Sequence, residues 1–215
     1  RMARDIPDLD LHHPWDLTAE QAADIATSCE DAARGNDARI SNSEGATLYS
    51  QTSSFIYGNT HGFVGGYPTT RHSLSCAVIA QDGDDMQRDY WYDSNRIAGR
   101  LADPQSIGRR AAERAVARLN GRKLGTRSCP VLFNAEIATS LMRSLFGAIR
   151  GHAVYRKSTF LLDQIGESLF PDWVTISEDP LQPRGQASAP FDNEGVATAY
   201  REIVAGGILQ GYLLD

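Results

Sequence analysis

The segment from Cys129 to Lys157 constrains the fold most, because it joins a short apolar run to a helix whose two ends are both marked. The run from Cys129 to Phe133 predicts a buried strand, and Asn134 suits a helix N-cap, whose side chain accepts from a first-turn amide. We expect the helix to start at about Ala135 and to end at Gly151, a left-handed residue just past its last turn. One apolar stripe is formed by Ile137, Leu141, Met142, Leu145 and Ile149. A strand that leads into a helix N-terminus often carries catalytic groups, so this turn is the first candidate site.

The first half of the chain reads as a helix, several antiparallel strands and a second helix. Thr18 and Gln21 form a capping box, and the helix they start runs past Cys29, a core position, to Gly35. Strands are expected at residues 46–57, 62–67, 73–80 and 86–92, which are rich in β-branched and aromatic residues and separated by turn residues. Within residues 73–80, one face is formed by Leu74, Cys76, Val78 and Ala80. We therefore expect a hairpin through the turn at 81–85.

Asp103 and Pro104 mark the start of the second helix, as an N-cap followed by proline in the first turn. Its apolar stripe predicts a core-facing side and an end at Gly121, and its arginines predict a solvated outer side. The stripe is Ile107, Ala111, Ala115 and Leu119; the arginines are Arg109, Arg110, Arg114 and Arg118. Two helices can then cover one face of the sheet.

The rest of the chain predicts a second, smaller arrangement of strands. Residues 173–177 have strand composition, and residues 198–204 and 208–214 flank the turn Gly206-Gly207 as a hairpin. The whole pattern indicates an α+β fold of antiparallel sheets with helices packed on one face. We expect two units, residues 1–123 and residues 124–215, the second of them truncated.

Composition excludes several classes of function. The net charge of −6 provides no general attraction for phosphate backbones, so we expect no nucleic-acid partner. Three widely spaced cysteines favour reduced core thiols, and no segment has a membrane-spanning or signal pattern, so we expect a cytoplasmic location and no membrane partner. An arginine before the first methionine and an apolar final run, GGILQGYLLD, indicate a fragment of a longer protein.

The other histidines and aspartates form weak candidates for metal sites. His12 and His13 are adjacent, so their rings diverge, and a solvated or packing pair is favoured over a ligand pair. His61 and His72 could meet across strands but have no third partner. Asp82, Asp84 and Asp85 lack the spacing and closing glutamate of a calcium loop, which favours a turn role.

The residues from Gly166 onward carry a specific resemblance. The resemblance is to the TldD/PmbA (TldE) family of metalloprotease-related proteins, and two stretches carry it: GESLFPDWVTISEDP and GQASAPFDNEGVATAYREIVAGGILQGYLLD. Arg156-Lys157 is also similar to the family sequence that precedes these stretches. Residues 18–121 look like the central domain of that family. The resemblance implies that 1–123 is this central domain and that 124–215 is the start of the metalloprotease-like C-terminal domain.

The resemblance also implies what the turn at Asn134 should carry. In the TldD branch this turn holds a His-Glu-x-x-x-His motif, with two zinc ligands and a glutamate that activates water. Here Glu136 has no histidine before it, and Asn134 and Thr139 are poor zinc ligands. His152 follows Gly151 without a partner histidine. No catalytic, cofactor or metal residues are therefore assigned, and Glu136 and His152 are the weak catalytic candidates.

Without this motif, the sequence resembles the PmbA (TldE) branch of the family. The branch implies a zinc-free subunit that pairs with a catalytic TldD-like subunit as a cytosolic heterodimer, with zinc in the partner and unfolded peptide as substrate. The associations of the family are maturation of a peptide antibiotic, degradation of an antitoxin, and modulation of DNA gyrase. Two alternatives stay open: an active metallopeptidase that uses Glu136, His152 and further ligands, and a regulatory binding protein linked to gyrase.

Overall fold

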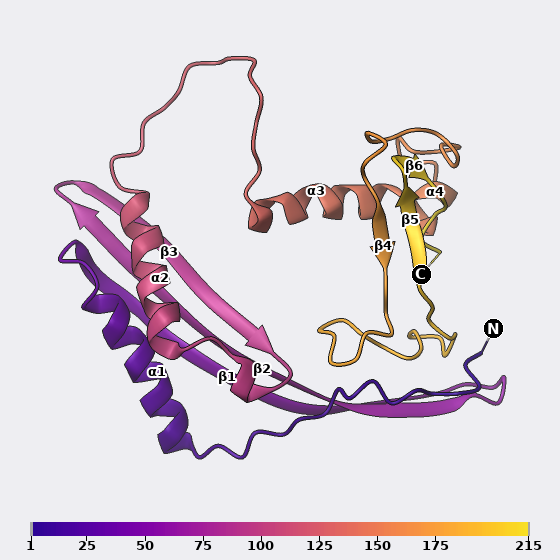
Figure 1. The fold of residues 1–215 in the computed structure, drawn as a ribbon, viewed down its shortest axis with the longest axis horizontal. Coiled ribbons are helices and arrows are strands. Elements are labelled where there is room, and N and C mark those ends of the chain that lie inside the picture. The colour runs from indigo at the N-terminus through magenta and orange to yellow at the C-terminus, as the bar shows by residue number, and fades with distance from the viewer. Residues whose placement is uncertain (1, 215) are drawn as a thin grey trace. The chain divides into compact units, whose positions relative to one another are not determined.

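The computed structural model describes residues 2–214, which form two compact units (Figure 1). Unit 1 contains residues 2–124 together with Leu181–Thr198, and unit 2 contains Gly125–Pro180 together with residues 199–214. The later segment Leu181–Thr198 thus packs with the first half of the chain. The division into two sequence domains, residues 1–123 and 124–215, remains our proposal.

Unit 1 is built on an antiparallel sheet, as predicted, but the sheet has three strands in the order β1-β2-β3 where four were expected. The strands are β1 (Ile40–Gly58), β2 (Val64–Asp82) and β3 (Asp85–Asn95), and Gly83 has a φ of +57° in the turn between β2 and β3. The predicted break between residues 67 and 73 is wrong, because β2 is continuous through Pro68. β3 pairs with β2 only from His72 onward, and the Thr70 amide points away from β1 to the Leu11 carbonyl. Because alternate residues of a strand face the same way, the nitrogen of Pro68 also points away from β1, and proline there costs no ladder hydrogen bond.

Two helices cover one face of this sheet, which confirms the expected packing (Figure 1). Helix α1 (Ala19–Arg34) has the predicted capping box at Thr18, and helix α2 (Pro104–Ala117) is capped by Asp103. A short 3-10 turn, η1 (Ala98–Arg100), precedes α2. The helix α2 ends at Ala117 rather than at Gly121. The core between helices and sheet consists of Cys29, Ala33, Leu74, Cys76, Val78, Ala80, Ile107, Ala111, Ala112 and Ala115.

The cysteines differ sharply in accessibility, which gives a direct test of this core. Cys29 and Cys76 are buried in unit 1, whereas Cys129 is exposed. A hydrogen bond with Cys76, together with burial, raises the pKa of the Cys29 thiol. Since the thiolate is the reactive form, we expect a thiol reagent such as DTNB to modify Cys129 rapidly in the native protein and the other two only after unfolding. Rapid modification of more than one thiol per native chain would contradict the packing.

Unit 2 contains two helices and a small sheet. The helices are α3 (Ala135–Ala148) and α4 (Gly151–Tyr155); the strands are β4 (Ile176–Glu178), β5 (Arg201–Ala205) and β6 (Ile208–Leu209), in antiparallel order β4-β5-β6. The predicted hairpin is confirmed, with Gly206 and Gly207 at φ of +54° and +81° in its turn. Its second strand is much shorter than predicted. The core is formed by Leu145, Ala148, Ile149, Leu161, Ile203, Val204 and Leu209.

Three local predictions in unit 2 are wrong. Residues 129–133 form no strand and Leu132 is 98% exposed, because among the described residues no neighbouring strand pairs with this run. Trp173 is 80% exposed and β4 begins only at Ile176. Gly151 starts α4 instead of ending α3, and its amide donates to the Leu213 carbonyl at 2.6 Å. Glycine suits that position because a Cβ there would lie 3.3 Å from the same oxygen.

Candidate functional site

The turn at the start of α3 is organised by its own helix. The Asn134 side chain accepts a hydrogen bond from the Glu136 amide at 3.1 Å, as the N-cap prediction requires. The Thr139 hydroxyl donates to the Glu136 carbonyl at 2.7 Å. The carboxylate of Glu136 lies in the first turn, where the helix dipole favours negative charge. These side chains serve the helix end, and none of the three is a nitrogen or sulfur ligand of the kind that zinc prefers.

The two weak catalytic candidates lie at opposite ends of α3. Glu136 is in its first turn, whereas His152 lies beyond its last residue, in α4. The twelve steps from Glu136 to Ala148 span about 18 Å along the helix axis at 1.5 Å per residue. One zinc ion needs ligands about 2 Å from it, so these two residues do not fit a shared metal. Across residues 2–214, no group of three or more His, Cys, Asp or Glu side chains is arranged to hold a metal ion.

The remaining histidines have separate surroundings in unit 1. His61 lies in the turn between β1 and β2, and His72 lies eight positions along β2 from Val64, about 26 Å at 3.3 Å per residue. The two rings therefore do not meet. His72 is fully buried, with its ring nitrogens 2.9 Å from the Ser50 hydroxyl and 3.0 Å from the His13 carbonyl. The His13 ring lies 3.2 Å from the Asp10 carboxylate, whereas the side chain of the adjacent His12 is exposed.

The acidic turn between β2 and β3 has the structural role that its spacing indicates. Asp82 accepts from the Asn120 side chain at 3.1 Å, and Asp85 accepts from the Asn120 backbone amide. These hydrogen bonds hold the chain that follows α2 against the hairpin.

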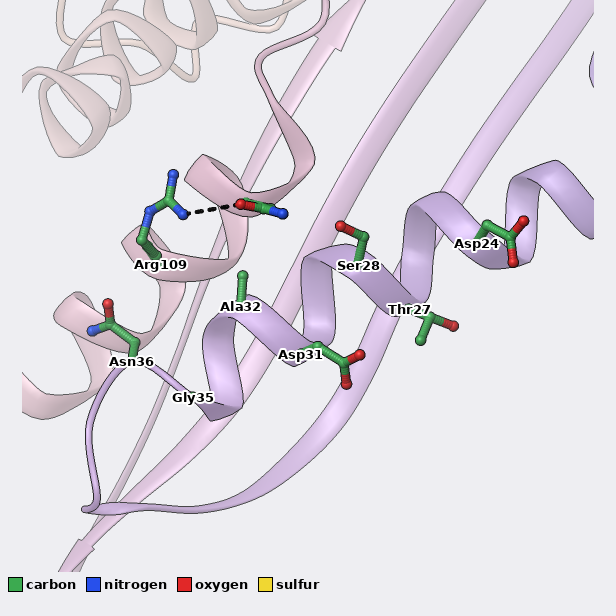
Figure 2. Close-up of a pocket in the computed structure, with 9 residues that line it drawn as sticks. Asp24, Thr27, Ser28, Asp31, Ala32, Gly35, Asn36 and Arg109 are labelled. Carbon is green, nitrogen blue, oxygen red and sulfur yellow. Dashed lines mark hydrogen bonds between the residues drawn. The ribbon is translucent and has the colours of Figure 1, made fainter.

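The groove between α1 and α2 is the polar surface shown in Figure 2. It has a volume of about 730 Å³, and Asp24, Ser28 and Asp31 line it from α1. Arg109 lines it from α2, but its guanidinium donates a hydrogen bond to the Gln105 side chain at 3.4 Å. The same guanidinium forms an ion pair with Asp103 at 3.7 Å. The groove therefore presents carboxylates and hydroxyls without a specific ligand geometry.

The sheet face of unit 1 opposite the helices carries an ordered row of side chains that sequence reasoning missed. Tyr49 on β1 and Tyr90 and Tyr92 on β3 are each about half exposed, and the last two stack with centroids 6.2 Å apart. Between them β2 contributes small residues: Ser73 pairs with Tyr49, Ser75 with Tyr92, and Ala77 with Tyr90. We call this surface the tyrosine face. Tyr90 and Tyr92 alternate with Trp91 in β3, and this spacing could have predicted that the two tyrosines share one face of the sheet.

The turn that carries the resemblance, Phe191 to Gly195, has a structural role in unit 1. The side chain of Asp192 accepts from the amides of Glu194 and Val196 at 2.8 and 2.9 Å, which fixes the turn. Phe191 is 1% exposed and packs against the rings of Phe55, Phe63 and Tyr67, with centroids 5.0 to 5.8 Å away. The turn anchors residues 181–198 to the long strands.

Family models match nearly the whole chain. Residues 12–119 match the PmbA/TldA metallopeptidase central domain, and residues 126–215 match the PmbA/TldA metallopeptidase C-terminal domain. These matches place the α+β architecture among metallopeptidase-related proteins. The chain belongs to the PmbA/TldA family.

Curated relatives carry the PmbA name. The chain is 47% identical over 213 residues to Metalloprotease PmbA of Escherichia coli O157:H7 and 46% identical over 213 residues to the Metalloprotease PmbA homolog of Haemophilus influenzae. Each match covers 99% of this chain and 47% of the relative. The chain thus spans about half the length of the curated relatives it matches.

Solved structures show the same fold. A candidate modulator of DNA gyrase from Bacteroides thetaiotaomicron matches with a TM-score of 0.94 at 26% identity, over 100% of this chain and 50% of that chain. TldE from Thermococcus kodakarensis matches with a TM-score of 0.74 at 17% identity, over 95% of this chain and 49% of that chain. The second likeness shows the fold alone.

Proposed function

We propose that the chain is part of a zinc-free subunit of a TldD–TldE type metalloprotease complex that acts in cytoplasmic peptide proteolysis. Its role is to bind peptide and to complete the complex, while a TldD-like partner supplies the zinc and the water-activating glutamate. The observation that carries the proposal is the composition of the α3 turn, where Asn134 and Thr139 serve as helix-end residues and Glu136 has no histidine beside it. The PmbA relatives support the choice of branch.

The membrane is not part of this proposal. None of the helices within residues 2–214 combines the length and apolar character needed to cross a bilayer.

The sheet of unit 1 supports the peptide-binding part of the proposal. Among residues 2–214 no further strand pairs with the outer edge of β1 or of β3, so both edges offer backbone amides and carbonyls. An extended peptide can add to such an edge by main-chain hydrogen bonds, which give affinity with little demand on its sequence. The tyrosine face beside these edges offers aromatic contacts for the side chains of the peptide.

The test is co-purification from the source cell. The tagged protein, expressed at its natural level, is expected to retain a paralogue that contains His-Glu-x-x-x-His, at one copy per chain, and peptidase activity is expected only in the mixture. Substituting both histidines of the paralogue should abolish activity without releasing it from the tagged protein. Purification without any such paralogue, or zinc-dependent peptidase activity from the tagged protein alone, would contradict the proposal.

A further inference from the structure

A small cavity lies on unit 1 where the segment Leu181–Thr198 crosses the end of the tyrosine face. It has a volume of about 300 Å³ and is lined by polar groups from three parts of the sequence. β1 contributes Gln51 and Ser53, and β2 contributes Tyr67, Thr69, Thr70 and Arg71; Arg96 and the residues from Gln186 to Ala189 complete the wall. We call it the arginine pocket. Every residue named as lining it belongs to unit 1.

The guanidinium of Arg96 is buried in this pocket without a counter-ion. The residue is 7% exposed, and its three nitrogens donate to the backbone carbonyls of Gly185, Thr70 and Gln186 at 2.8, 3.2 and 3.0 Å. Within residues 2–214 no carboxylate lies within 4 Å of it. Neutral carbonyls stabilise the cation but leave its full charge uncompensated, which is unusual for a buried charge.

Arg71 adds a second positive charge to the same pocket. Its Nε donates to the Ser94 hydroxyl at 3.2 Å, and among the described residues it likewise has no carboxylate partner. Burial lowers the pKa of the Arg96 guanidinium; Tyr67 opposes this shift, and the charge of Arg71 adds to it. The Arg96 guanidinium nevertheless keeps its charge at neutral pH, because arginine side chains are effectively always protonated in proteins. The pocket is therefore a local concentration of positive charge on a chain whose net charge is −6.

Hydrogen-bond donors remain available beside these charges. A guanidinium has five N–H groups, so three bonds from Arg96 leave two, and one bond from Arg71 leaves four. The pocket also presents the hydroxyls of Tyr67, Thr69 and Ser53. Positive charge, planar N–H donors and neutral hydroxyls together are the groups that bind a carboxylate.

We propose that the arginine pocket binds the C-terminal carboxylate of a peptide and so anchors the end of a chain whose side chains contact the tyrosine face. The proposal rests on the proposed peptide-binding function. The volume is at the small end of the range of about 300 to 1,000 Å³ for ligand sites, which suits a chain end rather than a folded partner. Arg71 and Ser73 are on the same side of β2, so the pocket continues directly into the tyrosine face.

The experiment compares one short peptide in two forms, with a free C-terminal carboxylate and with a C-terminal amide. Binding to the 215-residue chain is followed by NMR through the side-chain Nε–H signals of Arg71 and Arg96. The free acid is expected to shift both signals saturably, whereas the amide binds at least about tenfold more weakly because it lacks the charge. Equal affinity of the two forms would overturn the proposal.

Two variants separate the pocket from general charge effects. Arg71→Gln removes one cation with little loss of volume and is expected to weaken binding of the free acid about tenfold while leaving the amide unchanged. Arg88→Gln is the matched control, since Arg88 lies on the same sheet face but is paired with Glu44, and it should leave both peptides unaffected. Loss of binding in the control, or none in Arg71→Gln, would contradict a specific site.

Two small anions test whether the pocket prefers a peptide carboxylate to other anions. Acetate should shift the same signals only at much higher concentration, because it lacks contacts beyond the carboxylate. Inorganic phosphate should compete poorly with the free-acid peptide; displacement of the peptide by an equal or lower concentration of phosphate would assign the pocket to phosphate instead. These measurements need no partner subunit, so failure here and failure of the co-purification are distinguishable.

Discussion

Replacing Gly108 by alanine should destabilise unit 1 by about 3 kcal/mol, the upper part of the usual range for an overpacked contact. Gly108 lies on α2 where that helix crosses α1. A Cβ at this position would lie 2.0 Å from the Cys29 carbonyl oxygen and 3.0 Å from the Ala33 amide nitrogen. Both atoms belong to the backbone of α1 and cannot rotate away, so the two helices must separate and lose part of their packing.

The change is measured by urea unfolding followed through tryptophan fluorescence, to which Trp15 and Trp91 of unit 1 contribute. Gly99→Ala is the control within the same unit, because a Cβ at Gly99 meets nothing within 4 Å. Its effect should stay within about 0.5 kcal/mol, as for other surface substitutions. If Gly108→Ala is as stable as the control, α1 and α2 do not approach each other this closely.

Phe191→Ala should cost about 3 to 5 kcal/mol and should also release the segment Leu181–Thr198. The ring fills the space between Phe55, Phe63 and Tyr67, and it makes edge contacts with the last two at 5.0 and 5.4 Å between centroids. Its removal leaves a cavity that rigid strands cannot close. We expect a lower urea midpoint and earlier proteolytic cleavage within residues 181–198.

Ile56→Ala provides the comparison for this second prediction. Ile56 follows Phe55 on β1 but is 76% exposed, so its loss removes little buried area. The expected change is within about 1 kcal/mol, which covers the difference in strand preference. Unchanged cleavage of residues 181–198 in Phe191→Ala would show that the aromatic cluster does not hold this segment.

Local signals in the sequence identify most of unit 1. The capping box at Thr18, the Asp103-Pro104 helix start and the alternation from Leu74 to Ala80 each involve residues within one element, so their physical cause is readable from neighbours in the chain. The predicted end of α2 was less accurate, because helix ends depend on weak terminal hydrogen bonds.

The predictions that failed depend on distant contacts. An apolar run such as residues 129–133 becomes a strand only where another strand pairs with it, and spacing along the chain does not reveal that partner. Gly151 fits a left-handed helix end by sequence, yet its position is decided by the backbone at Leu213. The arginine pocket joins Arg96 to a residue 90 positions later in the chain, and Arg71 is still farther from it in sequence, so no local pattern predicts the pocket.

For the candidate catalytic residues, too, the sequence predicts the residue types and the structure gives their positions. The resemblance predicts where a metal motif would lie, and residue types alone show that Glu136 has no adjacent histidine. The structure adds that Glu136 and His152 lie at opposite ends of α3, which follows from the helix length. We therefore predict that the two residues do not bind one metal ion together.

The central claim is that the zinc of the complex is held by the partner subunit, and metal content tests it most directly. The longest natural form of the protein, the 215-residue chain and the co-purified complex are each exposed to zinc, desalted and measured by mass spectrometry of the metal. We predict one zinc per complex, lost when the partner's motif histidines are substituted, and far less than one zinc per chain in either isolated form. One tightly held zinc per isolated chain, removed by Glu136→Gln or His152→Ala, would contradict the account.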